Sequence, residues 1–347
     1  MRRRLPLVLL LVLALLVAAC GGDDDSSAGT SGTSSTAASA DKVDKITLGY
    51  SAWPGWFPLA IAEQKGIFDQ VGLKVDLRYF ADYVSSIEAF ASGKLDGNTQ
   101  TLNDTMASVA GGSDQVVVVV NDNSTGNDKI ICDKSITKMS DLKGKTVAAE
   151  AGVVDHFLLV QGLQKAGMTE KDIDFRGVLT DAAASSFASG EFDCVGVFAP
   201  FWLTALKRPG SHELFSSKDF PGIIPDHIVV SRKLVDEKPA AVQKLVDAWY
   251  LTLDWMKAHP DDATEIMAKA AETPVADYQQ LAEGTTIFTA KQASNAFKDG
   301  TTSTSLQYMA KLINPFLVAS GFSEKEAKLD GLFDASFTDD WLKRHPE

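Results

Sequence analysis

Two tryptophans, Trp53 and Trp56, flank a Pro-Gly turn in the segment SAWPGWFP. Side chains of this kind can enclose a small molecule, because ligand pockets are lined mainly by apolar and aromatic groups. They could also be core residues that brace the turn. A second aromatic segment, FAPFW, contains Phe198, Pro200 and Phe201. One or two of its rings belong to the core, and we expect another to close on a ligand.

The segment NTQTLNDTM contains polar side chains that could orient a ligand: Gln100, Thr101, Asn103 and Asp104. It follows a predicted strand and opens a predicted helix. The N–H groups at the start of a helix favour an anion, so this segment is a candidate anion site. Ordinary capping of the helix by Thr101 or Asn103 is the alternative.

Three further residues are candidates. Asp155 and His156 stand in AGVVDHF, at the start of another predicted helix. Asp155 is either the N-cap of that helix or a carboxylate that holds an ammonium or amide group of a ligand. His156 is either a surface residue beside the cap or a ligand contact. Asp226 stands where the chain is expected to return to its first half, and is predicted to be a hinge or site residue.

Motifs for catalysis or for metal binding do not occur in these segments. The sequence has no Gly-x-Ser-x-Gly elbow, and GKT at 144–146 lacks the upstream glycine of a phosphate loop. The segment NDNSTGND is similar to a calcium loop, but Cys132 stands where that loop needs a glutamate. We therefore predict a binding protein rather than an enzyme, with no catalytic residue, cofactor or metal.

The net charge of the chain limits the classes of binding partner. The 347 residues carry a formal net charge of −13, which argues against nucleic acid because phosphates need basic patches. A small anion is still possible, since local dipoles rather than net charge bind it. We expect a monomer that binds a small-molecule solute.

The N-terminal segment MRRRLPLVLLLVLALLVAAC has the charged and apolar layout of a secretory signal. Its end resembles the bacterial lipoprotein signal, so residues 1–19 are predicted to be a signal peptide and Cys20 a lipidation site. The alternative is a leader cleaved nearby, with Cys20 incidental. Residues 20–44 are predicted to be a flexible tether. We expect the protein in the cell envelope, anchored by this lipid to the outer face of the cytoplasmic membrane, or else in the periplasm.

Two cysteines remain, Cys132 and Cys194. Their spacing fits no zinc motif. An exported protein can form a disulfide between them, but we expect two buried thiols.

The chain contains an internal repeat. FASGKLDG (90–97) returns as FASGEFDC (187–194), VDLR as IDFR, and KITLGYSAW as KTVAAEAGV, with offsets of 97, 98 and 100 residues. A near-constant spacing indicates one supersecondary unit laid down twice. Each unit alternates strands with helices, which predicts two α/β lobes, each a mostly parallel sheet flanked by helices. Ligands bind beyond the carboxyl ends of such strands, so we expect a cleft between the lobes.

The lobe boundaries follow from the repeat. Lobe 1 is predicted to be discontinuous, with residues 45–132 and 226–340, and lobe 2 to be residues 133–225. The two crossings would form a hinge.

The sequence resembles the nitrate, sulfonate and taurine family of solute-binding proteins of ABC importers. The resemblance rests on LGYSAWPGWFPLAIAEQKGIFDQVGLKVDL, FASGKLDG, SDLKGKTVAAEAG, LLVQGLQKAG and FASGEFDCVGVFAPF. It implies the two-lobed fold of type II periplasmic binding proteins and a solute delivered to an ABC permease and its ATPase. By family position the ligand loops are Trp53–Trp56, Gln100–Asp104, Asp155–His156 and Phe198–Phe201.

The ligand is predicted from these loops. Helix N-termini favour a sulfonate, yet the loops contain Asp104 and Asp155 and no arginine or lysine. A zwitterion would satisfy both, with its ammonium on Asp155, so we predict an organosulfonate or taurine-like solute ahead of nitrate. The alternatives are a pyrimidine, thiamine-precursor or amide solute, or a ligand-sensing lipoprotein. Relatives of this fold that make a thiamine pyrimidine precursor carry a cysteine-rich run, which this chain lacks.

Overall fold

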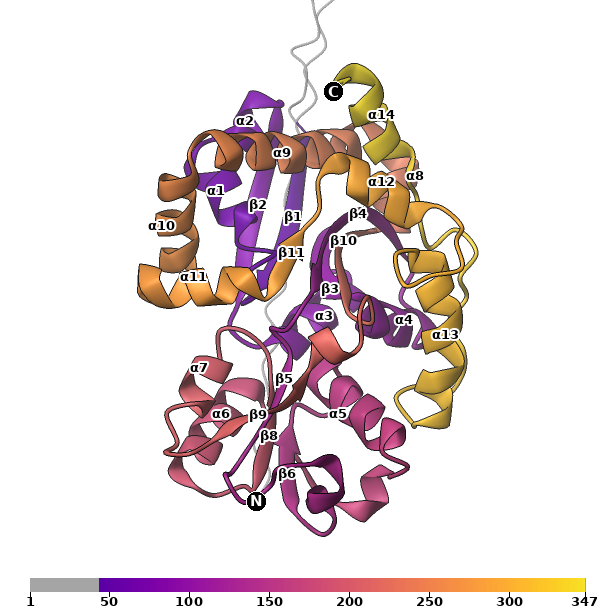
Figure 1. The fold of residues 1–347 in the computed structure, drawn as a ribbon. Coiled ribbons are helices and arrows are strands. Elements are labelled where there is room, and N and C mark those ends of the chain that lie inside the picture. The colour runs from indigo at the N-terminus through magenta and orange to yellow at the C-terminus, as the bar shows by residue number, and fades with distance from the viewer. Residues whose placement is uncertain (1–43, 347) are drawn as a thin grey trace, which may run out of the picture. The chain divides into compact units, whose positions relative to one another are not determined.

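The computed structural model describes residues 44–346, and these form two α/β lobes (Figure 1). The predicted signal peptide, Cys20 and the tether up to residue 43 lie outside the described residues. Strand β1 begins at Asp44, one residue before the predicted start of the fold. Among the described helices, none combines the length and apolar character needed to cross a membrane.

The first lobe is built on a six-stranded sheet in the order β2-β1-β3-β10-β4-β11. Strands β1, β2 and β3 are parallel, whereas β10 runs antiparallel to both β3 and β4. The strands are β1 (Asp44–Ser51), β2 (Leu73–Phe80), β3 (Gly97–Thr101), β4 (Gln115–Ser124), β10 (Pro225–Ser231) and β11 (Thr285–Ile287).

The second lobe repeats this plan in a five-stranded sheet, ordered β7-β6-β8-β5-β9. Strands β6, β7 and β8 are parallel, and β5 is antiparallel to β8 and β9. The strands are β5 (Lys129–Cys132), β6 (Thr146–Ala149), β7 (Asp174–Gly177), β8 (Cys194–Val197) and β9 (His212–Ser216). The predicted fold class is therefore confirmed.

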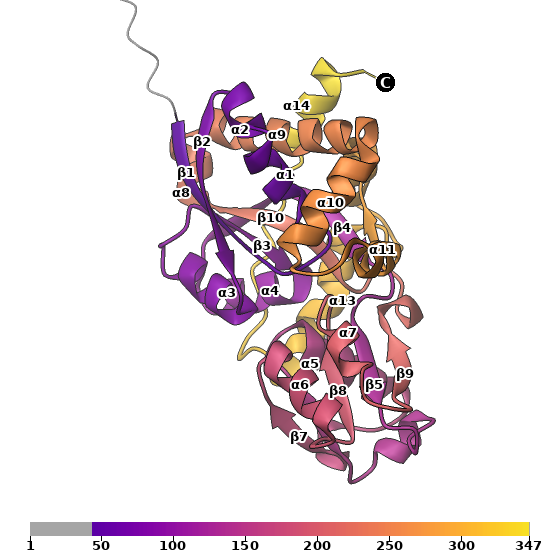
Figure 2. The ribbon, with the colours of Figure 1, turned by 90° about the vertical axis from the view of Figure 1, so that its left-hand side faces the viewer.

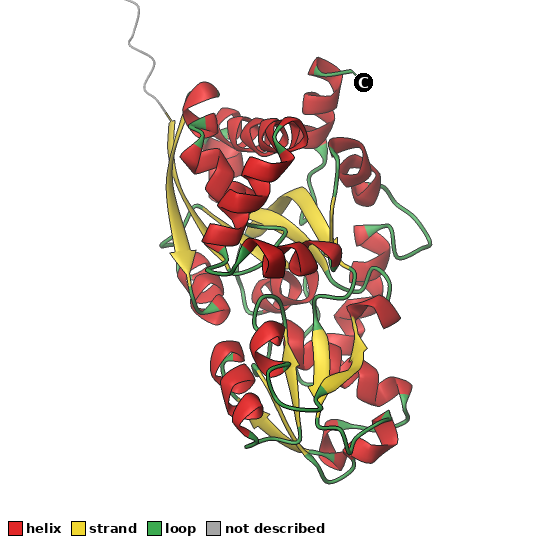
Figure 3. Cartoon of the chain, turned by 60° about the vertical axis from the view of Figure 1, so that its left-hand side comes forward, coloured by secondary structure: helices red, strands yellow, loops and turns green. Residues whose placement is uncertain are grey.

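Helices lie on both faces of each sheet (Figures 2 and 3). The first lobe begins with α1 (Pro58–Gln64), α2 (Ile67–Gln70), α3 (Tyr83–Ala91) and α4 (Leu102–Ala110), and the second has α5 (Val154–Lys165), α6 (Thr180–Ser189) and α7 (Trp202–Ala205). The C-terminal part is helical as predicted, with α8 (Arg232–Glu237), α9 (Pro239–Ala258), α10 (Pro260–Ala270), α11 (Val275–Glu283), α12 (Ala290–Phe297), α13 (Leu306–Ala319) and α14 (Ser336–Arg344).

The core of the first lobe is centred on β4. Its valines at 116–120 are fully buried, because an interior strand covered on both faces excludes water from every side chain. The β-branched shape of valine also suits a strand. At its carboxyl end the strand turns polar, with Asn121, Asp122 and Asn123, and these residues are buried too. This change from apolar to polar places polar groups at the edge where the lobes meet.

The repeat is visible in hydrogen bonds. Asp96, in the first octapeptide, accepts the Thr47 N–H through Oδ2 at 2.8 Å, and its own N–H donates to the Thr47 carbonyl. Asp193, in the second, makes the same two bonds with Thr146. The repeated aspartate therefore anchors the start of the third strand to the first strand in each lobe. Thr47 corresponds to Thr146, so the true offset of the first strands is one residue less than the sequence match of 100.

Two boundaries differ from the prediction. Strand β5 pairs only within the second sheet, so the first crossing lies before Lys129 rather than after Cys132. The C-terminal part is also not confined to lobe 1, because α13 packs on α4 and its Phe316 contacts α5. There, Phe157 of α5 meets Phe316 and Phe322 edge-on. The chain returns to the first sheet at β10, which begins at Pro225.

The two cysteines form a disulfide, so the expectation of two buried thiols is wrong. Cys132 and Cys194 are register partners on the antiparallel strands β5 and β8, and both are fully buried. The bond ties the strand that enters lobe 2 to the middle of its sheet. The sequence gives no spacing rule for such a pair, because the partners meet only through strand pairing.

Candidate functional site: a cavity between the lobes

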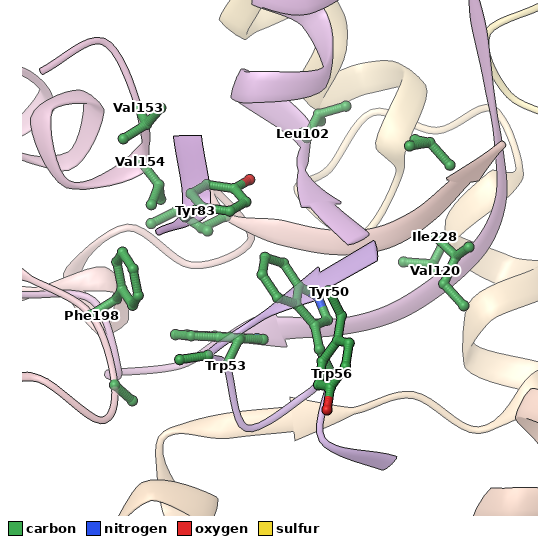
Figure 4. Close-up of a cluster of buried hydrophobic side chains, with 14 of the residues drawn as sticks. Tyr50, Trp53, Trp56, Tyr83, Leu102, Val120, Val153, Val154, Phe198 and Ile228 are labelled. Carbon is green, nitrogen blue, oxygen red and sulfur yellow. The ribbon is translucent and has the colours of Figure 1, made fainter. Parts of the chain in front are cut away.

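Side chains from both lobes line a small cavity where the strands end. The free space among them is about 10 Å³, roughly the volume that one water molecule needs, so the lobes are closed in this structure. The lining is mainly apolar and aromatic, and consists of Ala52, Trp53, Trp56, Tyr83, Val154, Phe198 and Ile224. Three polar residues complete it: Thr101, Asp128 and Asp226. Figure 4 shows Val154 and Phe198 on one side, facing Tyr83 and Trp53.

Aromatic rings form a continuous row across the two lobes. Trp53 and Trp56 lie 6.4 Å apart between ring centroids, and Trp56 lies 5.5 Å from Tyr83. Tyr83 then meets Phe198 of the second lobe edge-on at 6.3 Å, and Phe198 meets Phe201 at 5.4 Å. Edge-on and tilted pairs at these distances are attractive. The Tyr83–Phe198 contact therefore helps hold the lobes closed.

The position of Trp53 is fixed by Asp122 at the end of β4. The indole N–H of Trp53 donates to Asp122 Oδ1 at 2.9 Å. The other oxygen, Oδ2, lies against Gly55, where an added Cβ would be only 1.9 Å away. Only glycine leaves room for this carboxylate. The Trp-Pro-Gly-Trp turn is thus shaped around Asp122.

Asp226 lies directly opposite Asp122. The two are register partners across β10 and β4, and Thr101 is the partner of Asp226 on β3. Burial raises the pKa of Asp122 to about 7 and that of Asp226 well above its ordinary value, and the two carboxyl groups are hydrogen-bonded to one another. Two carboxylates this close cannot both ionise readily, so they share a proton.

Asp128 stands on the first crossing between the lobes, immediately before β5. Burial raises the pKa of its carboxyl group to about 7. Its Oδ2 receives no hydrogen bond from any group in residues 44–346. The adjacent Lys129 forms an ion pair with Glu213 at 2.6 Å and lies over the Trp202 ring. The basic residue adjacent to Asp128 in sequence therefore already has other partners.

The start of α4 is occupied by the protein's own carboxylate. Asp104, in the first turn, is buried and bonds with the Thr101 hydroxyl at 2.7 Å and with the Asn103 amide at 2.6 Å. Burial raises the pKa of Asp104 to about 7. Thr101 is the N-cap by position but makes no side-chain cap bond. The N-terminus of α4, where the helix dipole favours a negative charge, is therefore already occupied by Asp104.

A second cavity, of about 80 Å³, lies on the other side of the Tyr83–Phe198 contact. Glu150 at its wall accepts hydrogen bonds from the Thr180 N–H and from the Thr180 hydroxyl. The Thr180 hydroxyl is 2.6 Å from Glu150 and 2.9 Å from Asp155. One hydroxyl hydrogen cannot serve both carboxylates, which fits an Asp155 pKa raised well above its ordinary value by burial.

The structure brings five of the predicted residues to the first cavity: Trp53, Trp56, Thr101, Phe198 and Asp226. Phe201 lines the second cavity. Pro200 follows a cis peptide bond between these phenylalanines and lines neither cavity. Asn103 and Asp104 do not line the cavity, but both accept a hydrogen bond from the Thr101 hydroxyl. Asp155 is not the N-cap, which is Val153, and it lies behind Thr180 rather than in the cavity wall.

Two predicted residues are placed away from the cavity. Gln100 accepts a hydrogen bond from Thr105, which also bonds His227, on the α4 side of β3. His156 stacks on Phe175, accepts the Gly152 N–H and pairs with Glu170. Desolvation lowers the pKa of His156. Its role here is structural, beside the start of α5.

Sequence reasoning missed four residues of the site: Tyr83, Asp122, Asp128 and Glu150. Two of them belong to NDNSTGND, the segment that was rejected as a calcium loop. Within residues 44–346 no cluster of His, Cys, Asp or Glu could hold a metal ion. A different signal could have identified Asp122 and Asp128. Both are acidic residues that follow a buried run of valines, at the edge of the sheet where ligands bind.

Comparisons with known proteins agree with this architecture. Residues 53–263 match the NMT1/THI5-like family model, and the chain belongs to this family. An inferred binding protein of Brucella abortus is 28% identical over 277 residues, 78% of this chain and 85% of that protein. The taurine-binding periplasmic protein of Escherichia coli is 25% identical over 248 residues, 68% of this chain and 76% of that protein.

Solved structures show the same fold. The alkanesulfonate-binding protein of Xanthomonas axonopodis superimposes with a TM-score of 0.70 at 17% identity, covering 84% of this chain and 98% of that one. The nitrate-binding protein of Synechocystis gives 0.69 at 16% identity, covering 88% and 90%. The fold is that of type II periplasmic binding proteins. A desulfurization enzyme shares it with a TM-score of 0.59, so the fold alone does not define a function.

Proposed function

We propose that this protein is the extracytoplasmic solute-binding component of an ABC importer. It captures one small solute between its lobes and delivers it to a membrane permease driven by an ATPase. The observation that carries the proposal is the cavity itself, because each lobe contributes aromatic side chains to it and neither lobe encloses it alone. The names of the relatives, binding proteins for taurine and alkanesulfonate, support the same function.

The two crossings suit a hinge. Asn127, on the first crossing, accepts a hydrogen bond from the Trp202 indole at 3.1 Å. Ser124 and Ser217, on the two crossings, bond through their hydroxyl groups at 2.7 Å. These bonds hold the crossings together, and the lobes can separate about them as in other cleft-binding proteins. Opening is needed, because the closed cavity is smaller than any organic solute.

The location and the anchor belong to this proposal. A signal peptide and a lipid on Cys20 would hold the protein at the outer face of the cytoplasmic membrane, or on its periplasmic side, within reach of a permease. The disulfide within lobe 2 supports a compartment outside the cytoplasm. A sensor lipoprotein would use the same cleft, so the permease is what distinguishes the two functions. The protein would act as a monomer.

The predicted sulfonate has less support than the solute function. Four helix N-termini point toward the gap between the lobes, and each has a protein carboxylate: Asp82 on α3, Asp104 on α4, Asp155 on α5, and Glu150 on Thr180 of α6. An external anion would have to compete with these groups. The pyrimidine or amide alternative does not meet this obstacle.

The proposed function can be tested by asking which solute the protein captures from a mixture, without choosing a ligand in advance. The purified protein is dialysed against the small-molecule fraction of spent culture medium from its own organism, and retained compounds are identified by mass spectrometry. We expect one compound retained by the wild type and lost by the Phe198→Ala/Trp56→Ala variant. Retention of no compound, or equal retention by that variant, would contradict the proposal. Loss of uptake on deletion of an adjacent permease gene would separate import from sensing.

A further inference from the structure

Buried carboxylates surround the cavity between the lobes. Asp128 and Asp226 line it directly, each only 1% exposed, and Asp122 and Asp104 stand immediately behind them. The Oδ2 atom of Asp128 receives no hydrogen bond from any group in residues 44–346, whereas Asp122 and Asp226 bond to each other. Buried carboxylate oxygens without donors cost several kcal/mol. Groups left in this condition in a folded protein call for an explanation.

Basic side chains do not supply that explanation. Among the described residues, the lining of neither cavity includes lysine, arginine or histidine. Lys129 is the basic residue nearest in sequence to Asp128, and it already pairs with Glu213. Within residues 44–346 the carboxylates around the first cavity form no ion pair with a basic side chain, although the charge of Lys129 acts to lower the pKa of Asp128.

The aromatic rings of the cavity also favour a positively charged ligand. Trp53, Trp56, Tyr83 and Phe198 present their rings around the space that Asp128 and Asp226 line. A cation near the faces of such rings is attracted by their quadrupoles, by about 0.5–2 kcal/mol and most strongly when desolvated. An anion would be repelled by both the ring faces and the carboxylates.

We infer that the solute is a small organic cation, an amine or amidine, whose charged nitrogen lies against Asp128 and Asp226 and among the rings of Trp56, Tyr83 and Phe198. This inference rests on the proposed function and specifies its ligand. It also moves the cation contact from Asp155, where the sequence placed it, to the hinge side of the cavity. Asp122 is a positioning residue, since it holds Trp53 and shares a proton with Asp226.

The test uses probes matched in shape and different in charge. Isothermal titration calorimetry compares benzamidinium with benzamide and guanidinium with urea, and adds tetramethylammonium, taurine and methanesulfonate. We expect at least one cation to bind ten times more tightly than its neutral partner. Asp128→Asn is expected to weaken that binding at least tenfold. The control is Asp114→Asn, at a side chain 77% exposed and outside both cavities, and it should bind like the wild type.

Each other outcome has a definite meaning. Tight binding of taurine or methanesulfonate, unchanged or improved in Asp128→Asn, would overturn the cation and leave the solute-binding function intact. If Asp128→Asn does not fold, Phe198→Leu replaces it, with a smaller loss expected for cations alone. If no probe binds, the compound retained from the medium decides: a retained compound without a basic nitrogen overturns the inference. Retention of nothing contradicts the proposed function itself.

Discussion

Asp122 and Asp226 face one another across β4 and β10 and share a proton at the edge of the cavity between the lobes. One carboxyl group orients Trp53, and the other lines the cavity. The pair connects the aromatic wall to the acidic wall, so a change in either group is expected to affect both. A solute cation beside Asp226 would favour ionisation of the pair.

The first prediction concerns Gly55, which leaves room for Asp122. Gly55→Ala would put a Cβ 1.9 Å from the Asp122 carboxylate, and we expect it to lower the free energy of unfolding by roughly 1–3 kcal/mol. Urea denaturation measures this change. The control is Gly111→Ala, where the nearest atom is 3.3 Å away. In an Asp122→Ala background the cost of Gly55→Ala should shrink, and strictly additive effects would contradict the proposed contact.

The second prediction concerns closure through Tyr83 and Phe198. Phe198→Ala removes the ring that meets Tyr83 across the lobes, so the open form becomes more populated and the solute loses one wall. We expect solute affinity to fall roughly 10- to 100-fold and the radius of gyration in small-angle scattering to rise. Phe220→Ala, in lobe 2 against Phe215, should leave both unchanged. An unaltered affinity in Phe198→Ala would exclude this closure contact.

The third prediction is an unusual dependence of stability on pH. Asp104, Asp122 and Asp128 have pKa values raised from 3.8 to about 7 by burial. Between pH 4 and 7 the native state therefore keeps protons that the unfolded chain has released, and the free energy of unfolding falls as pH rises. His227, with its pKa lowered to about 3 by burial, acts in the opposite direction below pH 6.5, as does His156.

Because three carboxyl groups outweigh these imidazoles, the melting temperature of the solute-free protein should fall by roughly 5 °C or more between pH 4.5 and 7.5. Differential scanning calorimetry measures it. Asp128→Asn should reduce the slope, and His227→Gln should steepen it. A melting temperature that rises over this range would show that the buried carboxyl groups ionise freely in the native state.

The fourth prediction concerns the disulfide of lobe 2. Cys132 and Cys194 close a loop with a sequence separation of 62, so removing the bond should lower the free energy of unfolding by roughly 2–4 kcal/mol. The Cys132→Ser/Cys194→Ser variant and the wild type in reducing agent should lose the same amount. More than one free thiol on the untreated protein, which allows for Cys20, would contradict the bond.

The sequence predicted the fold well because the repeat encodes it locally. Each octapeptide carries an aspartate that ties the third strand to the first, and glycines end the helices that precede these strands. The first crossing was placed too late because KIIC, the strand β5, has no counterpart in the repeat. The Cys132–Cys194 bond was missed for the same reason, since its geometry comes from strand pairing.

The candidate site was predicted in part. Aromatic residues next to turns were identifiable because few other roles need two tryptophans around Pro-Gly. Asp122 and Asp128 were overlooked because their spacing was compared with a metal loop, whereas their position follows from the end of β4. Asp155 and His156 were chosen for their helix start, but the sequence could not reveal that Thr180 and Phe175 occupy their side chains.

The most direct test is a crystal structure of the protein with the solute retained from its own medium. We predict that the solute lies between Trp56, Tyr83 and Phe198, with a nitrogen about 3 Å from a carboxylate oxygen of Asp128 or Asp226. A solute bound outside this cavity, or one that turns a sulfonate or carboxylate toward these two aspartates, would contradict it.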